Sequence, residues 1–271
     1  MQEIILDDQA VSEYYSAGEK GELFLKKYLE KNYDPVVNDS FIIKSNDLKI
    51  IWKGKYKGKI HKLREVAINE FKGVKLSSDI EQQFVIDDIL DKDIKLITVV
   101  GHAGTGKTFI SLLGSLAMSD KVIYTREVVG VGRSLGLLPG ELEEKFAPYL
   151  AGLWSNIDAI EELTFERVGE KVEPKPIEYM RGANIKNKYL IVDEAQNADK
   201  HILKTLISRA GEGCKVILCG SMEQIDDKSL RGEGNGFKQV INAFRGVNLF
   251  SNNNLTKDKR SRLAMLADKL L

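Results

Sequence analysis

A glycine-rich segment preceded by an apolar run constrains the fold of this chain more than any other feature. The segment 101–108 reads GHAGTGKT and follows the run 96–100, which reads LITVV. The pattern GxxxxGKS/T, placed after a strand and before a helix, is the phosphate-binding loop. Its glycines let successive backbone N–H groups point at an anion, and the N-terminal end of the following helix adds a positive dipole. The chain is therefore expected to bind a nucleotide on an α/β domain.

A plain turn between strand and helix is the alternative interpretation, but it leaves Lys107 and Thr108 unexplained. We expect the Lys107 ammonium to reach the terminal phosphates. The Thr108 hydroxyl is expected to bind an octahedral Mg²⁺ that also touches phosphate oxygens. The predicted nucleotide contacts along this segment are Gly101, His102, Ala103, Gly104, Thr105, Gly106, Lys107, Thr108 and Phe109.

The composition describes an ordinary globular protein. Of the 271 residues 43% are hydrophobic and 30% charged, and 40 Lys and Arg balance 40 Asp and Glu. The overall charge therefore predicts no class of partner. Cys214 and Cys219 are too few for a disulfide framework, and we expect them to be buried free thiols in a reducing compartment. No run approaches the ~20 apolar residues of a membrane span, so we expect a cytoplasmic protein with no membrane partner.

Short apolar strands alternate with helical patterns from residue 94 onward. This alternation predicts an α/β domain with a mainly parallel sheet. Strands are expected at 96–100, 122–125, 189–192, 216–219 and 247–250, and helices at 107–118, 140–160 and 200–210.

The pattern is different near the N-terminus. Residues 19–31 are typical of a helix, and residues 41–43 and 48–56 are typical of strands. We therefore predict a small N-terminal α+β appendage over residues 1–75 and a nucleotide-binding domain over residues 76–271. The appendage is expected to be too small to be stable alone.

A second apolar strand ends in two acids and predicts the other half of the nucleotide site. Residues 189–192 read YLIV and run into Asp193 and Glu194. Parallel sheets place their ligand chemistry at the C-terminal ends of such strands. Asp193 is expected to hold Mg²⁺, usually through water, and Glu194 to polarise the water that attacks the γ-phosphate. The second acid argues against a nucleotide kinase, whose acceptor is a substrate and not water.

Two glutamines are further candidates. Gln224 follows the strand expected at 216–219 and could sense the γ-phosphate, although an ordinary strand-end turn also explains it. Gln82 precedes the first strand of the domain, and its amide can donate to and accept from the N7 and N6 edge of adenine. Gln83 competes for that role, and a solvated helix surface explains either residue.

A basic segment is the candidate nucleic-acid surface. Residues 44–64 hold eight Lys and Arg against the single acid Asp47. Strand periodicity places Lys53, Lys55, Lys57 and Lys59 on one face, opposite Trp52 and Tyr56. Such a face could neutralise nucleic-acid phosphates, and a solvated surface is the alternative. The periodicity directs the two aromatic rings toward the core, which argues against base stacking.

Four segments together resemble the PhoH-like ATPases, which are relatives of the superfamily-one helicases. The segments are the phosphate loop, 125–127 with 135–145 (LGLLPGELEEK), 179–182 (YMRG), and 193–197 (DEAQN) with 220–226. The run 135–145 is the most specific, because phosphate-loop chemistry in general does not demand it. The resemblance covers residues 79–271. It implies a RecA-like core, ATP with Mg²⁺, ring oligomers expected to be hexamers, and a link to RNA remodelling.

In ring ATPases the nucleotide site lies between subunits, so the resemblance implies a cation donated by the next protomer. Arg260 is the first candidate because it matches the family position, and Arg262 is the second; a basic helix start is the alternative interpretation. Arg126 and Arg181 also match family positions. Each could contact phosphate, nucleic acid or a neighbouring subunit.

The end of the chain, 257–264 (KDKRSRLA), looks like the subgroup whose ATPase follows a PIN-type nuclease domain. Residues 1–75 cannot hold a PIN domain of ordinary size and show no spaced acids after strands, so nuclease activity is not carried over from this resemblance.

The predicted function is ATP hydrolysis by a helicase-like remodeller of single-stranded nucleic acid, RNA rather than DNA. The alternative is a nucleotide-dependent ring-forming switch with slow ATPase and no nucleic-acid substrate. A small-molecule kinase is disfavoured by Glu194.

Overall fold

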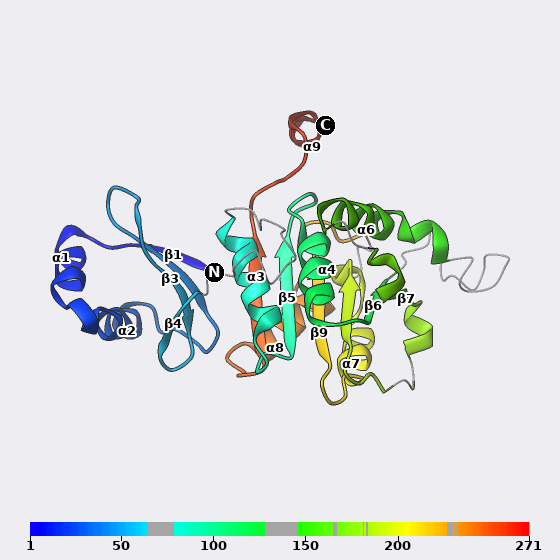
Figure 1. Ribbon diagram of the computed structural model, residues 1–271, viewed down its shortest axis with the longest axis horizontal. Coiled ribbons are helices and arrows are strands. Elements are labelled where there is room, and N and C mark those ends of the chain that lie inside the picture. Colours follow the sequence, from blue (N-terminus) through cyan, green and yellow to red (C-terminus); the bar gives the residue numbers. More distant parts are fainter. Residues whose placement is uncertain are drawn as a thin grey trace.

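The computed structural model describes residues 1–63, 79–127, 146–164, 167–180, 182, 184–226, 230 and 232–270. Two sheets organise these residues, a four-stranded sheet near the N-terminus and a six-stranded sheet in the rest of the chain (Figure 1). The predicted boundary between residues 75 and 76 lies outside the described residues and stays a prediction.

The six-stranded sheet is parallel throughout and has the order β10-β5-β9-β8-β6-β7. The predicted α/β class with a mainly parallel sheet is therefore confirmed. Strand β9 lies between β5, which leads into the phosphate loop, and β8, which ends at Asp193 and is followed by Glu194. The strands are β5 (Leu96–Gly101), β6 (Val122–Arg126), β7 (Val172–Pro174), β8 (Tyr189–Asp193), β9 (Lys215–Gly220) and β10 (Phe250–Leu255).

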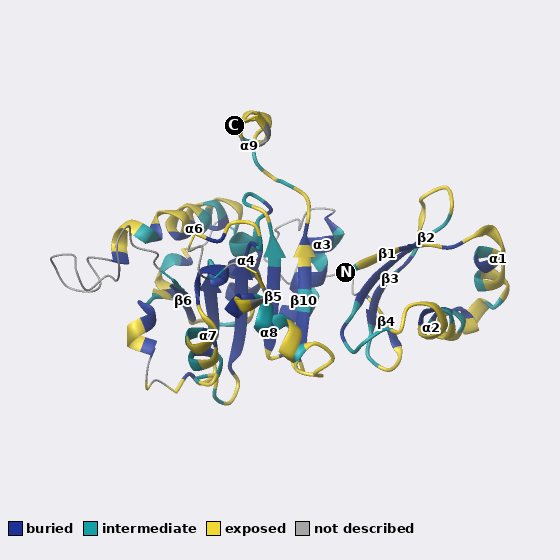
Figure 2. Ribbon diagram, turned by 180° about the vertical axis from the view of Figure 1, so that it is seen from behind, coloured by how far each residue is buried: buried dark blue, intermediate teal, exposed yellow. Residues whose placement is uncertain are grey.

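Helices cover both faces of this sheet, so its strands are buried on both sides (Figures 1 and 2). Parallel strands of this kind are nearly continuous apolar runs, as β8 and β9 are here. One face packs against α3 (Ile80–Leu90), α4 (Lys107–Met118) and α6 (Ala151–Thr164). The other face packs against α7 (Lys200–Ile207) and α8 (Gly236–Phe244). The short 3₁₀ turns are η4 (Ala147–Leu150), η5 (Gly169–Lys171), η6 (Ile177–Met180), η7 (Ala195–Asn197) and η9 (Gly232–Gly234).

The last strand is displaced from its predicted position. Residues 247–249 do not form the strand expected at 247–250, because Gly246 adopts φ 82° and Val247 N–H donates to Phe244 O, 2.9 Å away, in a turn. Strand β10 instead runs through Ser-Asn-Asn-Asn, a sequence with low strand propensity. Two of these polar residues gain buried partners: Ser251 Oγ and Asn253 Nδ2 both donate to Asp88 Oδ2, at 2.7 and 2.6 Å.

The N-terminal sheet has the order β1-β2-β3-β4, with β1 parallel to β2 and the other pairs antiparallel. Helices α1 and α2 cover one of its faces (Figure 2), where Trp52 is buried with Leu25 and Leu29. Its elements are β1 (Gln2–Ile5), α1 (Asp8–Ser16), η1 (Gly18–Lys20), α2 (Gly21–Asn32), β2 (Ser40–Lys44), β3 (Ile50–Tyr56) and β4 (Ile60–Lys62).

The opposite face of this sheet packs against α3, and the lysines of β3 lie in that interface. Lys55 is only 2% exposed, pairs with Asp88, and lies with Nζ 3.0 Å from Asp87 Oδ2. Burial alone lowers the pKa of Lys55, but the charges of Asp88 and Asp87 outweigh burial and raise it overall. Lys53 Nζ donates to Gln83 Oε1 at 3.1 Å, and Lys57 pairs with Asp91.

These contacts correct the prediction of a lysine row that faces nucleic acid. The ammonium of Lys55 is buried against two carboxylates of α3 and cannot reach a phosphate. Lys53 and Lys57 also have partners on that side. Lys59 is exposed, and its contact with nucleic acid stays a prediction.

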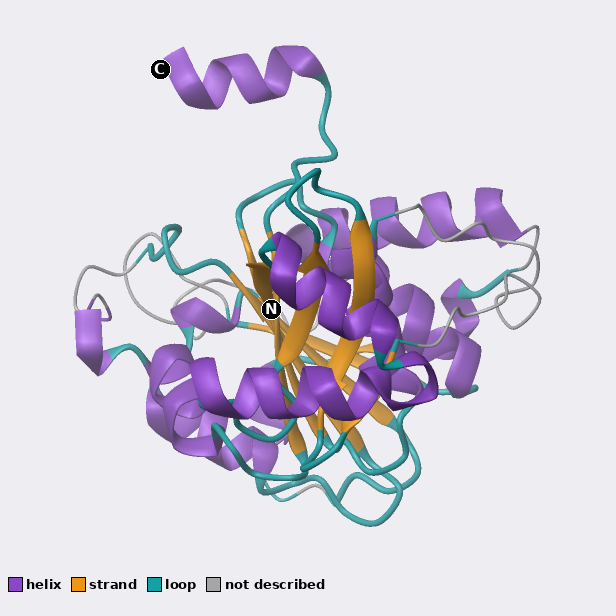
Figure 3. Cartoon of the chain, turned by 90° about the vertical axis from the view of Figure 1, so that its left-hand side faces the viewer, coloured by secondary structure: helices purple, strands orange, loops and turns teal. Residues whose placement is uncertain are grey.

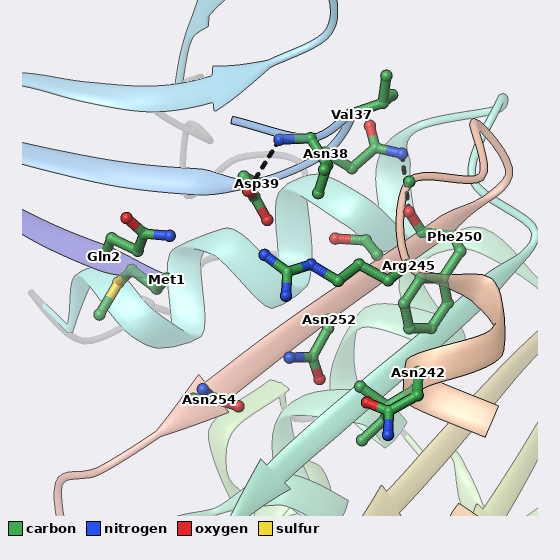
Figure 4. Close-up of a pocket in the computed structure, with 14 residues that line it drawn as sticks. Met1, Gln2, Val37, Asn38, Asp39, Asn242, Arg245, Phe250, Asn252 and Asn254 are labelled. Carbon is green, nitrogen blue, oxygen red and sulfur yellow. Dashed lines mark hydrogen bonds between the residues drawn. The ribbon is translucent and has the colours of Figure 1, made fainter. Parts of the chain in front are cut away.

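A second contact joins the N-terminal sheet to the edge strand β10. Asn38, in a left-handed conformation with φ 70°, donates from Nδ2 to Asn248 O at 3.1 Å and to Phe250 O at 2.7 Å. Beside it lies a polar cavity of about 260 Å³, into which Arg245 extends (Figure 4).

Helix α9 (Arg262–Leu270) lies apart from both sheets, beyond the C-terminal ends of the strands (Figures 1 and 3). Its Leu263 and Leu270 are 78% and 74% exposed. Among the described residues, no helix combines the length and apolar character that a bilayer crossing requires.

Candidate nucleotide-binding site

The phosphate loop connects β5 to α4, as the sequence predicts. Gly104 and Gly106 have φ values of 76° and 83°, in the left-handed region that L-residues rarely adopt. Thr105 is buried and its Oγ1 donates to His102 O at 2.9 Å, a hydrogen bond within the loop that stabilises the turn. The loop therefore ends with α4 directly behind it, and the helix N-terminus supplies unpaired N–H groups for an anion.

Lys107 is the first residue of α4, and its side chain folds back over the loop. Its Nζ donates to Gly101 O and His102 O, both at 2.8 Å. This position puts a positive charge beside the backbone that is expected to hold phosphate. Phe109 instead packs against the hydrophobic core under α4, and its nucleotide contact stays a prediction.

The two predicted metal ligands meet although they are far apart in sequence. Thr108 Oγ1 donates to Asp193 Oδ1 at 2.9 Å, because α4 packs over β9 and reaches β8. A hydroxyl and a carboxylate are hard oxygen ligands of the kind Mg²⁺ prefers. Among the described residues, no three His, Cys, Asp or Glu side chains gather in a metal-binding group. A magnesium ion held here would draw its other ligands from water and from phosphate, which fits its usual behaviour.

Tyr124 is a residue of this site that sequence reasoning missed. It lies on β6, is 1% exposed, and donates from its hydroxyl to Asp193 Oδ2 at 2.8 Å. Burial, with the Asp193 charge as the next cause, raises the pKa of Tyr124, so the phenol stays protonated and donates. Both oxygens of Asp193 are thus held, one by Thr108 and one by Tyr124. A tyrosine within an apolar strand is the signal that could have found it, because a buried hydroxyl needs a partner.

Glu194 follows β8 in a strained conformation. Its φ of 50° is uncommon for a non-glycine residue, and such strain concentrates at functional sites. The turn directs the chain away from β8 immediately after Asp193. Glu194 Oε2 accepts a hydrogen bond of 2.6 Å from Gln196 Nε2.

Gln196 connects Glu194 to the end of β9 and is the second residue whose role the sequence did not reveal. It is fully buried, donates to Gln224 O at 2.9 Å, and accepts from Ser221 N–H at 3.0 Å. A side chain at Gly220 would collide with this amide. Gln224 itself is exposed, and only its backbone carbonyl takes part in these bonds. The phosphate-sensing role of the Gln224 side chain stays a prediction.

The structure separates the two glutamines of α3. Gln82 Nε2 lies 3.4 Å from Thr105 O, against the phosphate loop, and a Cβ on Gly106 would come within 3.0 Å of it. Gln83 points instead toward the N-terminal sheet, where Lys53 donates to it. Gln82 is therefore the better placed of the two for a nucleotide contact, and its role with adenine stays a prediction.

The predicted arginines have different surroundings. Arg126 ends β6 in register with Asp193, donates from Nη1 to Tyr149 O at 3.1 Å, and has a buried Nε with no hydrogen-bond partner among the described residues. Arg260 lies against Gly104 of its own chain. Arg181 and the segment 135–145 fall outside the described residues.

Comparison of the sequence with known proteins identifies a family. Residues 76–269 match the family model described as PhoH-like protein. The chain is 35% identical to protein PhoH2 of Bacillus subtilis over 71% of this chain and 47% of that protein. It is 36% identical to the PhoH-like protein of the same organism, over 57% of this chain and 51% of that one.

The chain spans about half the length of the curated relatives it matches. A crystal structure of Bacteroides sp Pif1 in complex with ADP-AlF4 aligns with 70% of this chain and 44% of its own, at 15% identity and a TM-score of 0.32. The family match covers the six-stranded sheet together with the phosphate loop and the two acids. The chain therefore belongs to the PhoH-like protein family.

Proposed function

We propose that this protein binds ATP with Mg²⁺ at the C-terminal edge of the six-stranded sheet and hydrolyses it to ADP and phosphate. The observation that carries the proposal is the convergence of Lys107, Thr108, Asp193 and Glu194 at this edge. Lys107 and the loop N–H groups hold the phosphates, while Thr108 and Asp193 hold Mg²⁺. The ion supplies charge neutralisation for the transferring phosphoryl group.

Glu194 is the residue that makes water the acceptor. Its carboxylate accepts a hydrogen bond from Gln196, which restricts its position next to Asp193. In the proposed reaction Glu194 orients the attacking water, the oxygen of that water bonds to the γ-phosphorus, and the bond from phosphorus to ADP breaks. Catalysis of this kind is mainly positioning and electrostatics.

Gln196 is suited to report the state of the nucleotide. One amide contacts Glu194, the carbonyl of Gln224 and the N–H of Ser221. A shift of Glu194 on phosphate release would therefore move the loop that follows β9. In the proposal this is how hydrolysis changes a surface that contacts a partner.

The proposed partner is single-stranded nucleic acid, RNA rather than DNA, and the support for it is the family resemblance. Lys55 is no longer a candidate contact, while Lys59, Arg126 and Arg181 remain candidates. The exposed leucines of α9 offer apolar surface for contact between copies, which supports the proposed ring oligomer, expected to be hexameric.

Steady-state ATP hydrolysis by the wild type and Glu194→Gln tests the proposal, with and without single-stranded RNA and DNA at low salt. Glu212→Gln is the matched control, because it removes an exposed acid just before β9, at the opposite edge of the sheet. A rate that is lost in Glu194→Gln, kept in Glu212→Gln and raised by RNA supports the full proposal. A rate indifferent to both polymers favours the nucleotide-switched ring, and no hydrolysis by the wild type refutes both.

A further inference from the structure

The segment that follows β10 runs past the phosphate loop of the same chain. Lys259 N–H donates to Gly104 O at 2.8 Å. The next residue, Arg260, lays its side chain against Gly104 so closely that a Cβ at that position would overlap the arginine Cγ, Cδ and Nε. Two successive residues of this segment thus contact one glycine of the loop.

Helix α3 holds the same segment from the other side. Glu81 accepts hydrogen bonds from Thr256 N–H at 2.7 Å and from Thr256 Oγ1 at 2.6 Å. Lys259 Nζ lies 2.5 Å from Asp79 Oδ2, and Asp79 is also the N-cap of α3. The position of the segment over the loop is therefore secured at both of its ends by side chains of one helix.

Asp258 fixes the direction of the Arg260 guanidinium. Arg260 Nε lies 3.1 Å from Asp258 Oδ1, and Nη2 lies 2.7 Å from Oδ2. A forked pair of this kind restricts the planar guanidinium far more than a single contact would. The cation is consequently held beside the glycine that shapes the phosphate cradle.

We infer that Arg260 serves the nucleotide bound by its own chain, contacting the terminal phosphate in cis. This reverses the expectation from ring ATPases, in which Arg260 would reach the site of the next protomer. The reason is geometric, since the segment 256–260 is attached to its own loop and to its own α3. The inference rests on the proposed ATP site. It adds to that site a second positively charged side chain besides Lys107, supplied by the same chain.

Mixing two inactive variants separates the cis from the trans arrangement. Arg260→Ala keeps Glu194, and Glu194→Gln keeps Arg260. If Arg260 acts in trans, mixed oligomers contain complete sites and hydrolysis returns on mixing. We expect no return, with subunit exchange verified by energy transfer between labelled chains. Restored hydrolysis in the mixture overturns the inference.

Nucleotide binding gives a readout that does not depend on turnover. In the Glu194→Gln background, Arg260→Ala should weaken the binding of ATP by about tenfold more than the binding of ADP, because a charge-assisted contact to the terminal phosphate is lost. Arg260→Lys should lose part of this preference, since an ammonium cannot pair with Asp258 through a fork. Arg245→Ala, which removes an exposed arginine on the far side of β10, is the control and should leave both affinities unchanged.

The binding experiment is repeated at dilutions where light scattering shows single chains. A cis contact keeps its tenfold effect there, while disappearance of the effect on dilution overturns the inference. If the wild type hydrolyses ATP and the Arg260→Ala variant does so at the same rate, the inference is refuted and the proposed function stands. A wild type that neither binds nor hydrolyses ATP refutes the proposed function itself.

Discussion

Replacing Tyr124 by Phe removes one oxygen atom from the site and tests whether Asp193 must be held from both sides. The tyrosine ring is fully enclosed, so Phe can occupy the same space with little change in packing. The lost contact is the 2.8 Å hydrogen bond from the phenol to Asp193 Oδ2. Thr108 and the backbone N–H of Glu194 would still hold Oδ1.

The expected size of the effect follows from the charge of the acceptor. A hydrogen bond to a charged group contributes about 1.5–3 kcal/mol. Because about 1.4 kcal/mol corresponds to a factor of ten, the loss corresponds to about 10–100-fold. Removing a partner of a metal-binding side chain typically costs a similar factor in metal affinity or activity. We therefore expect Tyr124→Phe to need about 10–100 times more Mg²⁺ for half-maximal hydrolysis, or to lose that factor in kcat/KM.

The assay is a Mg²⁺ titration of the initial rate at fixed ATP, with thermal unfolding measured in parallel. Tyr189→Phe is the matched control, because it removes a hydroxyl at the opposite end of β8, where the tyrosine donates only a 3.4 Å hydrogen bond to Ile89 O. A folded Tyr124→Phe protein that needs the same Mg²⁺ concentration for half-maximal hydrolysis as the control, or a lower one, would refute the reasoning.

Four further predictions concern other contacts. Gly104→Ala should weaken nucleotide binding by at least about tenfold in a fluorescence titration, because a left-handed L-residue costs roughly 1–2 kcal/mol before any clash with the neighbouring arginine; normal affinity would contradict this. Gln196→Ala should bind nucleotide but hydrolyse it slowly in single-turnover experiments, since Glu194 loses the amide that positions it and the loop after β9 loses two further hydrogen bonds. Lys55→Met should destabilise the protein by about 3–5 kcal/mol in urea unfolding, because two carboxylates lose a buried partner, and a change below about 1 kcal/mol would show that the pair is solvated. Burial lowers the pKa of Lys215 to about 8. Between about pH 8 and 10 the unfolded state therefore binds more protons than the folded state, and the free energy of unfolding rises with pH. Lys215→Met should flatten that rise in unfolding experiments.

The error over the lysine row shows what a strand pattern leaves open. Alternation correctly placed Trp52 and Lys55 on opposite faces of β3, with the tryptophan toward the core of the N-terminal sheet. It could not show that α3, some thirty residues further along, would cover the lysine face with Asp87 and Asp88. The local sequence of a strand is the same whether the second face of its sheet is covered or solvated. Here the long-range contact with α3 decides between the two.

The amino-acid sequence by itself determined the class of sheet and the residues of the candidate nucleotide site. The loop from Gly101 to Thr108 and the strand that ends at Asp193 are local patterns, because a phosphate loop uses adjacent backbone N–H groups and parallel sheets place their ligand chemistry at the C-terminal ends of strands. Most of the strands were also predicted from local sequence, because each is a short apolar run.

Only the tertiary structure decided which side chains meet. The polar strand β10 forms because Asp88, 163 positions earlier than Ser251, accepts its hydrogen bonds. Tyr124 reaches Asp193 because β6 and β8 are neighbours in the sheet, and Arg260 lies on its own loop because α3 holds the connecting segment. In each case the partner comes from a distant part of the chain, so no local pattern of residues carries the information.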